Sequence, residues 1–213
     1  MNPSRFVVAE PFFETDFTEC STNTCSGAWS SNDISDYYID TTSNYLNCDG
    51  GLKWNGMSYA FGSSVSDTAF AMRFNADVTS ITTGNCHHGW VLSADQVYGT
   101  GFVYAGIVCT ADGSTLTVNG TTSNFTLGTN LDATMTVRDY FLQVLRTTAT
   151  NLDGSASSTS AYSGDIGTNS VTISSSVINL DNFKANNRWY DSLANINSDV
   201  YDITIYDGVT SFP

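Results

Sequence analysis

The sequence is almost without glutamate. Of its 21 acidic residues only Glu10, Glu14 and Glu19 are glutamates, and the rest are aspartates. Aspartate favours turns and caps, whereas glutamate and lysine fill exposed helix faces. Serine (27) and threonine (28) make up about a quarter of the 213 residues, a bias toward strands and turns. We therefore expect very little helix.

Basic residues are also scarce. Seven lysines and arginines, spread singly, oppose the 21 acids and leave a net charge of −14. No basic patch can neutralise phosphates, which excludes nucleic acid and anionic membrane surfaces as partners. The chain also has no run of eighteen apolar residues, so we expect no membrane insertion.

Catalytic and zinc motifs are absent as well. No C-x-x-C pair, G-x-S-x-G nucleophile elbow or glycine-rich phosphate loop occurs. His87 and His88 are adjacent, and adjacent strand residues point to opposite faces, so a regular strand cannot direct both at one metal ion.

Five cysteines without zinc spacing indicate disulfides in an oxidising compartment. We expect a local Cys20–Cys25 bridge and a nonlocal Cys86–Cys109 bridge, which leaves Cys48 as the odd residue. The sequons that begin at Asn119 and Asn124 agree with glycosylation and an extracellular or cell-surface location.

Apolar residues alternate with a period of two, which predicts half-buried strands. The segments with this pattern are 69–76, 115–118, 140–146, 170–174 and 201–206. Turn signals such as Asn55-Gly and Asp112-Gly separate them at short intervals. The pattern predicts an all-β fold, a two-sheet antiparallel jelly-roll sandwich. The serine-rich stretch 151–164 is predicted to be a long exposed loop.

Five segments occur in an order that points to a known superfamily. They are Phe13-Glu-Thr-Asp-Phe, Trp29 with Tyr37-Tyr-Ile-Asp-Thr-Thr, Val65 to Phe74, His88-Gly-Trp-Val-Leu-Ser and Val200 to Val209. Together they resemble the concanavalin A-like lectin/glucanase superfamily, including its laminin-G-like modules. The resemblance implies a single jelly-roll domain over residues 13–213. It leaves function open, because this fold serves lectins, glycosidases and structural modules alike.

The enzymatic members of that superfamily provide a direct test. Their laminarinase-type glycosidases carry two glutamates and an aspartate that alternate on one central strand, so that two carboxylates flank the scissile bond. No glutamate follows Glu19 here, and Asp199 and Asp202, three residues apart, are expected to point to opposite faces. We therefore expect no glycosidase activity and no other enzymatic activity.

Two further implications of the resemblance concern ligands. A structural calcium ion would be held by Asp202, in the last strand motif, with Asp16 as its partner, although two aspartates only begin a calcium shell. Carbohydrate binding would use an aromatic face surrounded by polar groups. The aromatic candidates are Trp54, Trp189 and Tyr190; Trp90 is also an aromatic candidate, and any single tryptophan here is more often a core residue.

The first twelve residues suggest assembly. Residues 1–12 form an apolar arm ahead of the domain, and the arm is expected either to insert Phe6, Val7, Val8, Phe12 and Phe13 into a neighbouring subunit or to fold onto its own sheet. The first hypothesis is an extracellular structural module, the subunit of a homo-oligomeric fibre or filament assembled head to tail. The alternative is a lectin-like domain that binds glycans.

Overall fold

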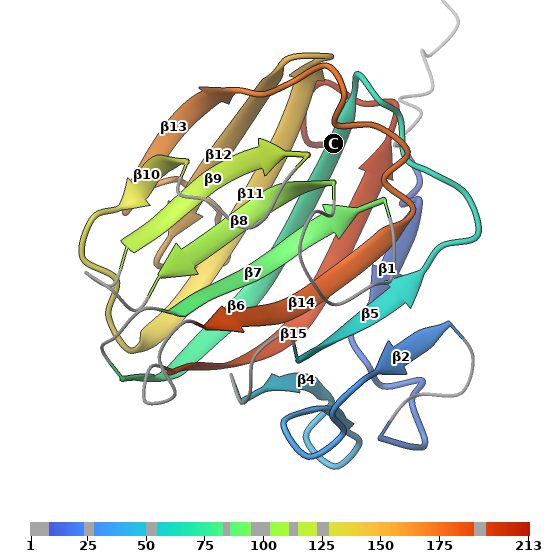
Figure 1. The fold of residues 1–213 in the computed structure, drawn as a ribbon, viewed down its shortest axis with the longest axis vertical. Coiled ribbons are helices and arrows are strands. Elements are labelled where there is room, and N and C mark those ends of the chain that lie inside the picture. The colour runs from blue at the N-terminus through green and yellow to red at the C-terminus, as the bar shows by residue number, and fades with distance from the viewer. Residues whose placement is uncertain are drawn as a thin grey trace, which may run out of the picture.

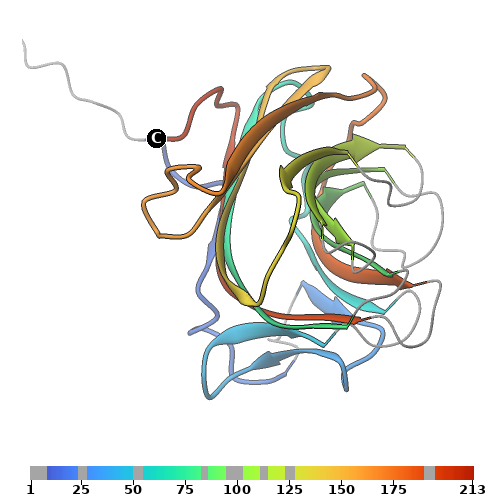
Figure 2. The ribbon, with the colours of Figure 1, turned by 90° about the vertical axis from the view of Figure 1, so that its left-hand side faces the viewer.

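We describe a computed structural model of the chain, which defines residues 9–23, 28–49, 55–82, 86–94, 103–110, 115–122, 128–189 and 195–213. All strands in these ranges belong to two antiparallel sheets that stack as a sandwich (Figures 1 and 2). The same ranges contain no helix, and hence none long and apolar enough to cross a membrane. The predicted all-β jelly-roll sandwich is confirmed.

The larger sheet, sheet A, has eight strands. In spatial order they are β13 (Gly167–Thr172), β12 (Asn151–Ser157), β11 (Arg138–Thr148), β6 (Phe70–Thr82), β15 (Asn195–Asp207), β4 (Tyr45–Cys48) and β3 (Tyr37–Asp40), and β1 (Phe13–Thr15) also pairs with β15.

Sheet B has seven strands. In spatial order they are β10 (Thr129–Asp132), β9 (Thr115–Thr121), β8 (Tyr104–Thr110), β7 (Cys86–Ser93), β14 (Asn182–Trp189), β5 (Gly56–Ala60) and β2 (Trp29–Ser31). In both sheets strands distant in the sequence are neighbours, as a jelly roll requires.

The hydrophobic core lies between the sheets, because each long strand directs alternate residues inward. On β6, Phe70, Met72 and Phe74 are fully buried. Trp90 of β7 meets them from sheet B, with its ring centroid 5.9 Å from that of Phe74. The core placement of Trp90 therefore follows from the alternation.

A buried arginine is the main polar exception on the inner face of sheet A. Arg146 of β11 is fully buried, yet its guanidinium donates three hydrogen bonds to backbone oxygens: Nη1 to Val177 at 2.6 Å, Nη2 to Ala149 at 2.7 Å and Nε to Thr148 at 3.3 Å. These bonds offset the cost of removing the charge from water and tie the turn after β11 to the segment before β14.

The prediction for the segment 151–164 is wrong for its first half. We expected a long exposed loop, but residues 151–157 form β12, which pairs with β11 on one side and β13 on the other. Leu152 and Ala156 are buried in the core. Gly154 lies where a Cβ atom would come within 2.6 Å of the Val118 side chain. Small residues occur here because the two sheets approach closely, so composition was a poor guide.

The N-terminal arm follows the second of its two predicted alternatives, folding onto its own sheet, at two of its five residues. Phe12 donates its backbone N–H to the Ile205 oxygen at 2.7 Å, and Phe13 pairs with Ile205 in sheet A. Their rings pack on the chain's own Phe61, with centroid distances of 5.4 and 5.2 Å. Phe12 and Phe13 are thus part of this chain's own sandwich. Phe6, Val7 and Val8 lie outside the described residues.

Candidate functional site

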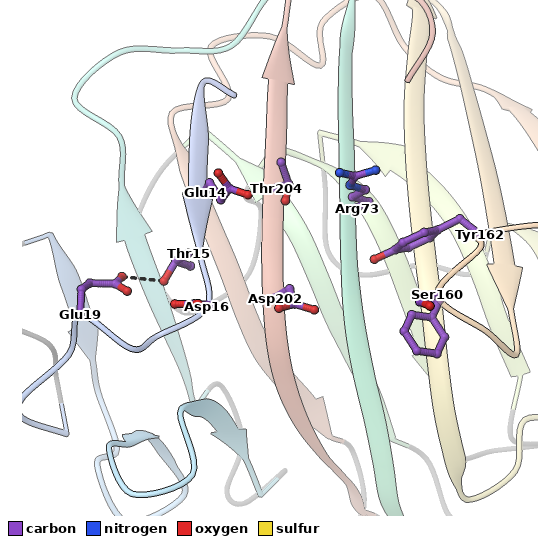
Figure 3. A pocket seen from close by; sticks show the side chains of 10 residues that line it. Glu14, Thr15, Asp16, Glu19, Arg73, Ser160, Tyr162, Asp202 and Thr204 are labelled. Atoms are coloured by element: carbon purple, nitrogen blue, oxygen red, sulfur yellow. Dashed lines mark hydrogen bonds between the residues drawn. The ribbon is translucent and has the colours of Figure 1, made fainter. Parts of the chain in front are cut away.

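A polar pocket of about 560 Å³ opens on the outer face of sheet A, the face directed away from the core (Figure 3). We call it the Arg73 pocket. Its lining residues come from β1, the turn after β1, β6, β11, β15 and the loop after β12: Glu14, Thr15, Asp16, Glu19, Arg73, Phe141, Ser160, Tyr162, Asp202 and Thr204. Side chains from three neighbouring strands meet in the pocket, because Thr204 of β15 has Glu14 of β1 as its cross-strand partner on one side and Arg73 of β6 on the other.

Arg73 is the cation of the pocket lining. Its Nη2 donates to the Tyr206 hydroxyl at 3.4 Å, and its Cζ lies 5.8 Å from that ring and 5.7 Å from the ring of Tyr162. Cation–π contacts of this length hold a guanidinium in place while its remaining N–H groups stay available. Arg73 is thus positioned to donate hydrogen bonds into the pocket.

The loop that carries Tyr162 is fixed by one carboxylate. Asp165 accepts hydrogen bonds from the Ser158 N–H at 3.0 Å, from the Ser163 hydroxyl at 2.8 Å and from the Ser158 hydroxyl. These bonds lower the pKa of Asp165 to about 2, and the bond from the Ser158 hydroxyl has the largest effect. Ionised Asp165 therefore holds the 158–165 loop together through charge-assisted hydrogen bonds at neutral pH.

Tyr162 itself has φ of 51°, the left-handed region that side chains other than glycine seldom occupy. Its ring meets Phe141 edge to face at a centroid distance of 5.7 Å. Burial, with a further contribution from Asp202, raises the pKa of the Tyr162 phenol to about 12, so the hydroxyl stays protonated. The loop thus holds a half-buried aromatic ring beside Arg73, at the wall of the pocket.

Two of the pocket's carboxylates are already bonded to their own turn. The Thr15 hydroxyl donates to Glu19 Oε1 at 2.6 Å, and Asp16 Oδ1 accepts from the Thr18 hydroxyl at 2.6 Å and the Thr18 N–H at 3.0 Å. The bonds from Thr18 lower the pKa of Asp16. In contrast, partial burial and then the charge of Asp16 raise the pKa of Asp202. Asp16 and Asp202 are therefore close enough for their charges to repel each other.

The structure corrects the expected orientation of Asp199 and Asp202. The register of β15 against β6 shifts between Val200 and Ile203, and this shift is a β-bulge. Both Val200 and Ile203 point into the core. The bulge places Asp202 on the same outer face as Asp199, whose cross-strand partner is Asp77. A regular strand would have placed them on opposite faces, and a bulge leaves no plain mark in the sequence.

Calcium is not supported at Asp16 and Asp202. Calcium takes six to eight oxygen ligands, and within the defined ranges no three His, Cys, Asp or Glu residues could hold a metal ion. The guanidinium of Arg73 lines the same pocket and Asp16 is engaged by Thr18. The donor set here does not fit the ion.

The predicted aromatic sugar-binding residues cannot be placed at the pocket. Tyr190 and Trp54 lie outside the described residues, as does the side chain of Trp189, whose backbone ends β14. Sequence reasoning missed Arg73 and Tyr162. The alternation around Arg73 did indicate an outward side chain, whereas nothing marked Tyr162 within its serine-rich segment.

The cysteines form fewer bridges than expected between the described side chains. Cys109 is a buried thiol whose Sγ lies 3.5 Å from the His88 oxygen, so the predicted Cys86–Cys109 bridge is wrong. The register explains why, because Cys109 pairs with His88, two residues beyond Cys86. Cys48 is a free buried thiol, and burial raises its pKa.

Cys20 is disulfide-bonded to a partner outside the described side chains. Because Cys25 lies outside the described residues, the Cys20–Cys25 bridge stays a prediction.

One sequon is also corrected. Asn119 is only 7% exposed, its Nδ2 donates to the Tyr104 hydroxyl at 3.3 Å, and its Oδ1 accepts from the Gly120 N–H. The nitrogen to which a glycan would be attached is therefore buried and bonded in the sheet. Asn124 lies outside the described residues.

The histidine pair behaves as the strand geometry predicts. His88 is fully buried, 3.4 Å from the Tyr37 hydroxyl through Nδ1, whereas His87 is partly exposed on the other side of β7. Burial lowers the pKa of His88 to about 3, so its ring stays neutral.

The sequence matches no protein-family model and no curated protein. Solved structures are similar in fold. The metal-free exoplasmic/lumenal domain of VIP36 has a TM-score of 0.56 at 10% identity, covering 96% of this chain and 95% of that domain. Lectin II from Ulex europaeus gives 0.54 at 9% identity, over 91% and 97% of the two chains.

These structures decide the fold. The chain has the concanavalin A-like fold. A third similar structure is the CBM2 module of the evolved Dit protein of Lactobacillus casei BL23 phage J-1, with a TM-score of 0.56 at 13% identity over 96% and 98% of the two chains. VIP36 has also been solved with Ca²⁺ and Man3GlcNAc bound. The resemblance seen in the sequence segments is therefore confirmed at the level of fold.

Proposed function

We propose that the chain is a non-enzymatic glycan-binding module that acts outside the cell or in a secretory lumen, and that the Arg73 pocket is its sugar site. The observation that carries the proposal is the placement of the Tyr162 ring, fixed by Asp165, beside Arg73 and Asp202. Sugars bind where an aromatic surface meets directed hydrogen-bonding groups. The lectins and the carbohydrate-binding module among the similar folds support this choice.

The charge of the pocket selects the sugar class. Four carboxylates line it against one guanidinium, in a chain of net charge −14. Like charges repel sialylated, uronic or sulfated glycans. We therefore propose neutral sugars, whose hydroxyls can donate to the carboxylates and accept from Arg73.

Hydrolysis is not proposed, although two glutamates and two aspartates line the pocket. A glycosidase needs one carboxyl held protonated and a second, ionised carboxylate across the bond. Glu19 and Asp16 are instead bonded to threonines of their own turn. The apolar arm was one support of the fibre hypothesis, and two of the arm's five residues pack inside this chain. Glycan binding is the better supported function.

An array of neutral, cationic and anionic glycans tests the proposal with wild-type protein and the Arg73→Gln and Tyr162→Ala variants. We expect binding to neutral glycans that each variant weakens about tenfold, the equivalent of about 1.4 kcal/mol. Tyr201→Ala is the matched control, because Tyr201 is a partly exposed tyrosine of β15 outside the pocket lining.

Two results would contradict the proposal. Equal binding by wild type and both pocket variants would place the sugar site elsewhere. Chain-length shortening of a bound oligosaccharide, abolished in Asp202→Asn, would make the protein an enzyme.

A further inference from the structure

A second pocket of about 560 Å³ lies on the same outer face of sheet A. We call it the Phe212 pocket. Its lining comes from β11, β12, β13 and the C-terminal segment and includes Gln143, Asp153, Ser155, Thr168, Asn169 and Phe212. In Figure 2 the C-terminal segment and the orange loop after β12 both stand off this face of the sheet.

The two pockets adjoin through a pair of cross-strand neighbours. Gln143, in the Phe212 pocket, is the register partner of Arg73, in the Arg73 pocket. Such partners have Cβ atoms about 5 Å apart. On β11 itself, Phe141 lines one pocket and Gln143, two residues on and on the same face, lines the other. A ligand longer than one pocket can therefore extend directly into the next.

The lining of the Phe212 pocket combines apolar surface, to which Leu145 and Phe212 contribute, with side chains that form hydrogen bonds. Asp153 is the one ionisable residue of its lining, and its Oδ1 already accepts from Asn151 Nδ2 at 2.8 Å and from the Ser170 hydroxyl. Hydroxyls and amides, which both donate and accept hydrogen bonds, make up most of the rest. The Ser155 hydroxyl, for example, donates to Gln143 Oε1 at 3.3 Å. Phe212 adds a partly exposed aromatic ring.

A polypeptide fits this surface less well than a sugar chain. Peptides commonly bind sheets by adding a strand at an edge, where backbone N–H and C=O groups are unpaired. The floor of the Arg73 pocket is made of β15, β6 and β11, and β11 and β12 continue it under the Phe212 pocket; each of these strands is paired on both sides. Among the strands that line the Phe212 pocket, only β13 is an edge strand. Over the paired strands recognition has to come from side chains that point outward, which suits hydroxyl-rich rings.

We propose that the Phe212 pocket is a second sugar subsite, and that the two pockets together bind a linear neutral oligosaccharide across β15, β6, β11 and β12. The inference rests on the proposed glycan-binding function and adds the length and the direction of the ligand. The Arg73 pocket binds one end of the oligosaccharide through hydrogen bonds from the Arg73 guanidinium. The Phe212 pocket contacts the sugar residues that follow.

Titration calorimetry with cello-, laminari- and manno-oligosaccharides of two and six residues tests this subsite. We expect a hexasaccharide to bind at least tenfold more tightly than the matching disaccharide, and Phe212→Ala to remove most of that gain while disaccharide affinity stays unchanged. Thr210→Ala is the control, because Thr210 is an exposed neighbour outside the pocket lining. Unchanged thermal unfolding of Phe212→Ala would confirm that the fold is kept.

The outcomes separate the two proposals. Equal affinity for short and long chains, unaffected by Phe212→Ala, would overturn the subsite and leave the Arg73 pocket as the whole site. No binding of any oligosaccharide by wild type would overturn both.

Discussion

Strand β6 presents two different environments on its two faces. Phe70, Met72 and Phe74 are fully buried between the sheets, whereas Arg73 and Asp77 point away from the core. The inner residues are fixed by close packing, where a lost methylene group is felt. Of the outer residues, Arg73 lines the pocket and Asp77 faces two further aspartates across the sheet. The comparison implies that inner-face changes alter stability, and outer-face changes alter binding or electrostatics.

Arg146 offers the strongest test of that division, because it is a charged residue on the inner face of β11. Arg146→Met keeps most of the side-chain volume but leaves the oxygens of Thr148, Ala149 and Val177 without their donor. An unsatisfied buried polar group costs about 1–3 kcal/mol. We therefore expect a loss of about 3 kcal/mol or more in the free energy of unfolding, measured by denaturant titration.

Arg138→Met is the matched control on the same strand. Arg138 is exposed, and its Cζ lies 5.7 Å from the Tyr140 ring, so its loss is expected to change stability by about 0.5 kcal/mol or less. If both variants unfolded like wild type, the buried guanidinium would contribute nothing net and the inner face would tolerate an apolar residue there.

Much of the sandwich could be predicted from alternation alone. The pattern at 140–146 identified β11 because its inward residues are large and apolar, apart from Arg146 itself. It failed at β12, whose inward residues include Gly154 and Ala156. There the close approach of Val118 requires small side chains, so the strand resembles a loop in composition.

The pocket was less accessible to sequence reasoning. The pairing of Asp16 with Asp202 was inferred from the superfamily resemblance, and both residues do line one pocket. Glu14 and Glu19 were not among the site residues predicted from the sequence, yet β1 pairs with β15, and both glutamates line the pocket together with Asp202. Such proximity comes from strand order between distant segments, which no local pattern records.

Phe13 and Glu14 repeat the comparison on β1, with a smaller expected effect. Phe13 packs inward with its ring centroid 4.5 Å from that of Tyr59, while Glu14 lines the pocket. Phe13→Ala is expected to lower the free energy of unfolding by about 2 kcal/mol, less than a fully buried phenylalanine. Glu14→Gln should leave it within about 0.5 kcal/mol.

Light scattering on the same two variants tests the assembly hypothesis. Because the contacts of Phe13 lie within the chain, neither variant is expected to change the oligomeric state. Loss of assembly in Phe13→Ala at unchanged stability would return this residue to an intermolecular arm.

The outer face of sheet A also carries an unfavourable row of charges. Asp139, Asp77 and Asp199 are consecutive cross-strand partners on β11, β6 and β15. Like charges directly opposite each other destabilise a sheet. Burial first, and then the charges of Asp77, Asp49 and Asp40, raise the pKa of Asp199 to about 6. Asn47 Nδ2 donates to Asp199 Oδ1 at 3.3 Å and opposes the shift.

The direction of the pH effect follows from that shift. Asp199 binds a proton in the folded protein at a higher pH than in the unfolded chain, whose value is near 3.8. Its ionised form therefore destabilises the folded state above pH 6, and the penalty is relieved as pH falls from 6 toward 4. Asp199→Asn is expected to stabilise the protein by about 1 kcal/mol at pH 7.5, a value reduced for partial solvent exposure. The gain should disappear by about pH 4.

Asp139→Asn removes one charge from the exposed end of the row and controls for net charge. A gain for Asp199→Asn that is the same at pH 7.5 and pH 4 would show that its cause is packing, and that the row of aspartates has no electrostatic cost.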